Sequence, residues 1–202
     1  EARFDNMKSW YLENGFDEVI EQKDYTNPIF TSTWGVSDED LVIKANEKFK
    51  SYSKNKENFV SVMFSSSNHM PFELPDGKIE FEKNLPRGSV ENAIKYADYA
   101  IGKLFELAKK EDYFKDTVFI IIADHNVRVY GDQVVPIDMF QIPGVIVSQD
   151  VPHQTYSRLT SQADVLATAL DLIGIDLSYP ILGNSIFKEN KKEINLMLFD
   201  EI

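Results

Sequence analysis

The sequence contains no cysteine among its 202 residues. This absence excludes disulfide scaffolds, zinc sites built from thiolates, and cysteine nucleophiles. Positive charge is also scarce: 21 Lys and Arg stand against 33 Asp and Glu, for a net charge of −12. Nucleic acids are bound mainly through clustered Lys and Arg, so no nucleic-acid partner is expected.

The chain has no apolar run of the about 18 residues that a membrane-spanning helix needs. It also lacks an initiator Met and a signal-peptide pattern at its start, Glu1-Ala-Arg-Phe-Asp5. We therefore expect a fragment whose upstream part is missing. No internal repeat and no Pro/Gly-rich linker divides the chain, which predicts a single domain over residues 1–202.

Helical and strand patterns alternate along the chain. Helical spacing and capping residues predict helices over residues 5–14, 37–51, 90–110 and 160–173. Apolar runs predict strands over residues 58–66, 117–123, 144–148 and 194–199. Continuous apolar runs are typical of strands covered on both faces, which indicates an α/β sheet between two helix layers.

Two of the three histidines follow predicted strands. His69 comes after residues 58–66, and Asp124-His125 comes directly after the run 117–123. Ligands of α/β sheets bind beyond the carboxyl ends of the strands, so both places are candidate sites. A carboxylate beside an imidazole suits Mn²⁺, Zn²⁺ or Mg²⁺ when other donors complete the site. An exposed turn with a solvated Asp-His pair is the alternative.

Several segments together resemble the sulfatase and lipoteichoic-acid-synthase branch of the alkaline phosphatase superfamily. They match in order over nearly the whole chain: Asn14–Asp17, Trp34–Leu41, Ser66-Ser-Asn-His-Met-Pro-Phe72, Thr117-Val-Phe-Ile-Ile-Ile-Ala-Asp-His-Asn-Val-Arg-Val-Tyr-Gly131, Ile142–Ile146, Leu159–Gly174 and Pro180–Gly183. The resemblance implies a three-layer α/β/α sandwich with a mostly parallel sheet. This chain would be a C-terminal fragment of that sulfatase-like catalytic domain.

The resemblance also implies roles for individual residues. Asp124 and His125 would be ligands of one divalent ion, with Mn²⁺ expected and Mg²⁺ or Zn²⁺ as alternatives. His69 would be a catalytic residue in contact with the substrate phosphate or the leaving group. Arg128 and Arg3 are further substrate-binding candidates, and a structural ion pair is the alternative for Arg128. The nucleophile of the family, a Thr, and another acidic ligand are expected upstream of Glu1, so the fragment alone is expected to be inactive.

The implied activity is that of a metal-dependent phosphoglycerol transferase. The donor would be a glycerophospholipid headgroup, and the acceptor a glycan or growing polymer of the cell envelope. The parent protein would be membrane-anchored through the missing N-terminal region, with its catalytic domain on the extracytoplasmic face of the bacterial inner membrane. A sulfatase acting on sulfate esters and a non-catalytic envelope domain are the alternatives. An incomplete sheet would also favour self-association of the fragment.

Other chemically suggestive residues are interpreted as structural. His153 lies in a polar connection and is expected at the surface. Ser161 and Asp164 stand at a helix start, where capping is the simpler role. The acidic run 38–40 is expected to be a solvated first helical turn, stabilised by the helix dipole. Trp34 either packs structurally or lines the mouth of a pocket.

Overall fold

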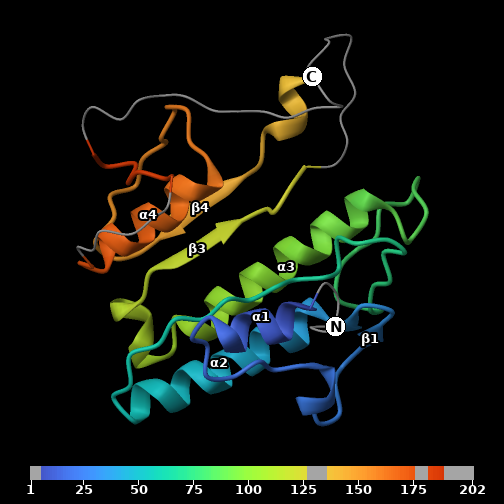
Figure 1. The fold of residues 1–202 in the computed structure, drawn as a ribbon. Coiled ribbons are helices and arrows are strands. Elements are labelled where there is room, and N and C mark those ends of the chain that lie inside the picture. The colour runs from blue at the N-terminus through green and yellow to red at the C-terminus, as the bar shows by residue number, and fades with distance from the viewer. Residues whose placement is uncertain (1–5, 127–135, 176–181, 189–202) are drawn as a thin grey trace. The chain divides into compact units, whose positions relative to one another are not determined.

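The computed structural model describes residues 6–126, 136–175 and 182–188 (Figure 1). The chain divides into two compact units, Glu1–Phe114 and Lys115–Ile202, called here the first and the second unit. The single domain over residues 1–202 stays a prediction. None of the helices in the described ranges is long and apolar enough to cross a membrane.

Three α-helices build the first unit, and α2 and α3 run side by side (Figure 1). Their bounds are Met7–Glu13 for α1, Asp38–Lys54 for α2 and Val90–Ala108 for α3. The predicted helices are therefore confirmed, with ends that differ by a few residues. Ser37 and Ser89 are the N-caps of α2 and α3, and each side chain accepts a hydrogen bond from a backbone N–H inside its helix. The caps explain why both helices begin where the sequence predicts.

The core of the first unit lies along one face of α3. The buried residues follow helical spacing: Ala93, Tyr96, Ala100, Leu104 and Ala108. Leu74 joins Ala93 and Tyr96 in one apolar cluster. Burial raises the pKa of Tyr96 to about 12, because the phenolate would lose its hydration there. Tyr96 is thus a core residue of the first unit.

A short hairpin precedes α2. Its strands are β1 (Thr31–Ser32) and β2 (Gly35–Val36), which pair antiparallel, and the 3-10 helix η2 (Gln22–Asp24) lies before it. The backbone N–H of Ser37 donates to Phe30 O over 2.9 Å. This bond joins the residue before the hairpin to the N-cap of α2, and Trp34 lies in the turn between β1 and β2.

The strand predicted over residues 58–66 is wrong for this structure. The backbone of residues 58–65 makes no ladder hydrogen bond with any part of the described chain, and Ser66 N–H donates to the Asp38 carboxylate instead. Val60, Val62 and Phe64 share one side of this extended segment, and all three are exposed. A strand needs a partner for its backbone groups, which sequence alternation alone does not supply.

The second unit contains the pair β3 (Phe119–Ile122) and β4 (Gly144–Val147), with the 3-10 helix η4 (Ile137–Phe140) between the two strands in sequence. The 3-10 helix η3 (Asp112–Asp116) includes the last residues of the first unit and the first residues of the second. The pair is antiparallel, with Phe119 opposite Val147 and Ile122 opposite Gly144. Both sheets in the described ranges are such two-stranded antiparallel pairs, so the mostly parallel sheet is not seen there. Burial on both faces needs further neighbours, and Ile122 and Val145 are exposed.

Helix α4 (Gln162–Leu172) is the last helix in the described part of the second unit. Ser161 and Asp164 form a reciprocal capping box at its start, which confirms the predicted capping role. The Asp164 carboxylate also accepts Asn184 N–H over 2.8 Å, tying residues 182–188 to the helix. Gly183 passes so close to the helix that an added Cβ would lie 2.0 Å from Ala163 O. The predicted strand 194–199 lies outside the described residues.

Candidate functional site

His69 lies in a loop of two consecutive turns in the first unit. Its N–H donates to Ser66 O over 3.1 Å, and its own carbonyl accepts Phe72 N–H over 3.0 Å. The peptide bond Met70–Pro71 between these turns is cis. Backbone hydrogen bonds therefore hold His69 from both sides while its side chain stays exposed.

Hydrogen bonding fixes which ring nitrogen of His69 carries a proton. Nδ1 lies 2.9 Å from Met70 O. A carbonyl oxygen only accepts, so Nδ1 must be the donor, and Nε2 is left to accept or deliver a proton. The same carbonyl accepts Trp34 Nε1–H over 2.6 Å. Trp34 and His69 also contact through their rings, whose centroids lie 4.0 Å apart at an interplanar angle of 56°.

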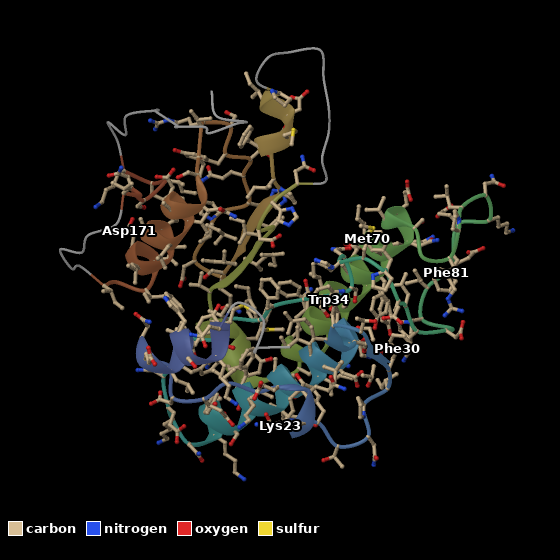
Figure 2. The ribbon with its side chains drawn as sticks, turned by 45° about the vertical axis from the view of Figure 1, so that its right-hand side comes forward. Lys23, Phe30, Trp34, Met70, Phe81 and Asp171 are labelled. Atoms are coloured by element: carbon tan, nitrogen blue, oxygen red, sulfur yellow. The ribbon has the colours of Figure 1, made fainter. Side chains whose placement is uncertain are left out.

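The hairpin turn that carries Trp34 is held from a second direction. The backbone N–H of Thr33 donates to Glu73 Oε2 over 2.6 Å. This hydrogen bond lowers the pKa of the Glu73 carboxyl, because it favours the ionised form. Figure 2 labels Trp34 and Met70, the two residues that the hydrogen bond from Trp34 Nε1–H joins. The Trp34 turn and the His69 loop are thus joined by several specific bonds, and Trp34 has a structural contact with the candidate residue.

The acidic run in the first turn of α2 is not the solvated turn that we predicted. Asp38, Glu39 and Asp40 are only 2%, 4% and 7% exposed. The prediction failed because each carboxylate has specific partners elsewhere in the first unit, and these partners replace water. The partners are the N–H groups of Ser66 and Ser67 for Asp38, Tyr99 Oη and Lys78 Nζ for Glu39, and the N–H groups of Ile29 and Phe30 for Asp40.

Asp124 and His125 follow the end of β3 in the second unit. Asp124 Oδ2 lies 3.7 Å from His125 Nε2, and both side chains are exposed, at 63% and 81%. Metal–oxygen and metal–nitrogen bonds are each about 2.0–2.2 Å, so two donors on one ion lie roughly 3–4 Å apart. The observed separation fits a shared divalent ion without further movement. The described ranges hold no group of three or more His, Asp or Glu side chains arranged for a metal.

His125 has the orientation of a metal-binding histidine. Its Nδ1 lies 3.0 Å from Asn126 O, so Nδ1 is the donor and Nε2 carries the lone pair. Histidines that bind metals usually donate their other ring N–H to a carbonyl or carboxylate in this way. Asn126 is itself held, because Nδ2 donates to Asp138 O over 3.0 Å and to Gln141 O over 2.7 Å.

Gln162 holds the same turn from the start of α4. Its Nε2 donates to Ala123 O over 3.0 Å and to Asp124 O over 2.8 Å. The two carbonyls immediately before the His125 side chain are thereby fixed. Sequence reasoning assigned no role to Gln162 or Asn126, because a Gln at the first position of a helix and an Asn in a turn carry no signal of their own.

The predicted site residues fall into three groups. Asp124 and His125 lie side by side in the second unit, and His69 belongs to the first unit. Arg3 and Arg128 lie outside the described residues. His153 is exposed, as predicted.

Comparison with known proteins agrees with the sequence pattern. Phosphoglycerol transferase I from Xanthomonas axonopodis pv. citri (strain 306) is 26% identical, over 86% of this chain and 26% of its own length. Lipoteichoic acid synthase from Staphylococcus aureus (strain USA300) is 24% identical, over 70% of this chain and 25% of its own length. The chain thus spans about a quarter of the length of these curated relatives.

Solved structures give a second line of comparison. A protein in the alkaline phosphatase superfamily from Vibrio parahaemolyticus matches with a TM-score of 0.92 and 45% identity, over 99% of this chain and 49% of that one. A lipoteichoic acid synthase from Listeria monocytogenes matches with a TM-score of 0.80 and 25% identity, over 92% of this chain and 51% of that one. The model of the Sulfatase family matches residues 1–175. The chain therefore belongs to the Sulfatase family and has the α/β fold of the alkaline phosphatase superfamily.

Proposed function

We propose that this chain is part of a metal-dependent phosphoglycerol transferase. The reaction moves a phosphoglycerol group from a glycerophospholipid headgroup to a hydroxyl of an envelope glycan or polymer. One observation carries the proposal: Asp124 and His125 stand 3.7 Å apart after β3, with the imidazole oriented through Nδ1. The names of the relatives, phosphoglycerol transferase and lipoteichoic acid synthase, support the substrate class.

In this proposal Asp124 Oδ2 and His125 Nε2 hold one divalent ion. Mn²⁺ is expected, with Mg²⁺ and Zn²⁺ as alternatives, because one carboxylate and one imidazole suit all three. Such an ion, once bound, neutralises negative charge on a phosphodiester and activates a hydroxyl nucleophile. The turn held by Asn126 and Gln162 keeps both donors in place. The 202-residue chain alone is proposed to be inactive, because none of its residues matches the Thr nucleophile of the family.

His69 acts on the substrate through Nε2. In the protonated form, Nε2–H donates to an anionic phosphate oxygen. The hydroxyl oxygen of the Thr nucleophile, which the family resemblance places outside these 202 residues, would bond to phosphorus and lose its proton to solvent. The phosphorus–oxygen bond to the diacylglycerol then breaks, the electron pair stays on that oxygen, and Nε2 supplies its proton. Arg128 and Arg3 are proposed to bind the phosphate through their planar guanidinium groups.

The partners and the location follow from the same proposal. The donor is a glycerophospholipid, so the protein works at a membrane surface, on the extracytoplasmic face of the bacterial inner membrane. The parent protein is proposed to be membrane-anchored through its N-terminal region. Self-association of the 202-residue fragment is a further expectation, which light scattering measures directly.

The test uses the full-length protein with phosphatidylglycerol labelled in its acyl chains and with an aryl sulfate. We expect Mn²⁺-dependent release of labelled diacylglycerol that is lost in Asp124→Ala and His69→Ala. His153→Ala is the matched control, because His153 is an exposed histidine outside both candidate places, and it should keep full activity. Hydrolysis of the aryl sulfate alone would move the assignment to sulfate esters. Absence of both activities would indicate a non-catalytic envelope domain.

A further inference from the structure

Asp38 is a buried carboxylate whose hydrogen bonds end in the loop that carries His69. The residue is 2% exposed and stands at the first position of α2. Its Oδ1 accepts Ser66 N–H over 2.9 Å and Ser67 N–H over 3.3 Å. Bonds from backbone N–H groups to an ionised carboxylate are stronger than neutral ones. Within the described chain, Oδ2 has no hydrogen-bond partner, so the carboxylate binds this loop alone.

The two bonds of Asp38 lie one turn away from His69. The N–H of Ser66 is held by Asp38, and the carbonyl of Ser66 accepts the N–H of His69 over 3.1 Å. Ser66 therefore links the carboxylate directly to the backbone of the histidine. A shift of Ser66 would therefore strain or break its hydrogen bond to His69.

The opposite side of the loop is held by Trp34, four residues before Asp38. Trp34 Nε1–H and His69 Nδ1 both meet Met70 O, at 2.6 Å and 2.9 Å. The segment from Trp34 to Asp38 thus fixes the loop at two places, one through the Ser66 backbone and one through Met70. Two attachments restrict the imidazole more than one, because a rotation about either attachment would break the hydrogen bonds at the other.

We propose that Asp38 is a positioning residue for His69: it fixes the turn that presents Nε2 to the phosphoester substrate. The inference rests on the proposed role of His69 and adds a residue whose carboxylate does not touch the substrate. The alternative is that Asp38 only stabilises the first unit. The two roles predict different outcomes in an Asp38 variant whose first unit stays folded: the His69 ring moves only if Asp38 positions it.

Nuclear magnetic resonance of the histidine rings tests the inference in the 202-residue chain. The sequence has three histidines, so the spectrum has three ring signals, and His69→Asn identifies the one of interest. Asp38→Ala should move or broaden the His69 signal and leave those of His125 and His153 in place. Asp38→Asn keeps an acceptor oxygen for Ser66 and Ser67 and should restore the wild-type signal. The matched control is Asn46→Ala, which removes another buried polar group of α2, bonded to Tyr113 Oη.

Titration with glycerol 1-phosphate separates this inference from the proposed function. Asp38→Ala should weaken binding about tenfold, the loss typical when a side chain that orients a ligand-binding residue is removed, and Asn46→Ala should not. Failure of the wild-type chain to bind glycerol 1-phosphate would count against the proposed role of His69, while the ligand-free signal still decides the role of Asp38. An unmoved His69 signal in folded Asp38→Ala would overturn the positioning role.

Discussion

Removing the Asp40 carboxylate is expected to destabilise the first unit strongly. Asp40 is 7% exposed, and its oxygens accept Ile29 N–H over 2.8 Å and Phe30 N–H over 3.2 Å. Oδ2 also accepts the Ser37 hydroxyl over 2.6 Å. The carboxylate therefore joins the chain before the hairpin to the N-cap of α2, and Asp40→Ala breaks this junction.

The magnitude follows from the groups that lose their partner. Two partly buried backbone N–H groups are left unsatisfied, at about 1–1.5 kcal/mol each when water reaches them in part. Loss of the hydrogen bond from the Ser37 hydroxyl costs a further ~1 kcal/mol at most. The free energy of unfolding should therefore fall by about 3 kcal/mol, a large part of the about 5–15 kcal/mol that a domain has. Asp40→Asn keeps one carbonyl acceptor and should lose roughly half as much.

Urea denaturation followed by circular dichroism measures this change. Asp98→Ala is the matched control, because Asp98 is an exposed residue of α3, and its stability should stay within about 0.5 kcal/mol of wild type. If Asp40→Ala lowers the free energy of unfolding by less than about 1 kcal/mol, and by no more than twice the change in Asp98→Ala, the Asp40 carboxylate does not stabilise the first unit.

Three further predictions concern the turn after β3, the chain after α4 and the buried tyrosines. Gln162→Ala should weaken Mn²⁺ binding about tenfold in calorimetry, because the carbonyls of Ala123 and Asp124 lose their hydrogen bonds from its side chain. Gln154→Ala, in an exposed loop, is the control, and equal Mn²⁺ affinities of the two variants would contradict this prediction. Gly183→Ala should lower the free energy of unfolding by about 2 kcal/mol in urea denaturation, since its Cβ would meet Ala163 O; a neutral effect would show that the close approach is relaxed. Tyr96 and Tyr113 have pKa values raised to about 12 from 10.0, so the stability they contribute is present below pH 10 and lost as the pH rises through 12. Tyrosinate absorbance and circular dichroism should show both ionising together with unfolding; ionisation near pH 10 in the folded chain would contradict their burial.

The sequence predicts best what local chemistry decides. Ser37 and Ser89 start their helices through bonds to residues three positions ahead, so the signal and its effect lie within one turn. The box of Ser161 and Asp164 works in the same way. The apolar alternation of residues 58–66 failed because pairing depends on distant segments, and the exposed positions of Val60 and Phe64 follow from this.

The candidate site shows the same difference between residues with local partners and residues with distant ones. Asp124 and His125 are adjacent in sequence, and their shared position after β3 needed only the strand prediction. The groups that orient them are not adjacent: Gln162 lies 38 residues from Asp124. Asp38 was wrongly predicted to be solvated for the same reason, because its partner Ser66 lies 28 residues away. A residue whose role depends on a partner across the fold has no local pattern to reveal it.

Electron paramagnetic resonance of Mn²⁺ tests whether Asp124 and His125 hold a divalent ion. The free ion loses signal when it binds, so the titration counts bound metal. The full-length protein should bind Mn²⁺, and the conservative variants Asp124→Asn and His125→Gln should each weaken or lose this binding. His153→Gln, a change at an exposed histidine away from the turn, should bind as wild type does. Wild-type affinity in Asp124→Asn, or no binding by the full-length wild-type protein, would show that Asp124 and His125 do not hold the ion.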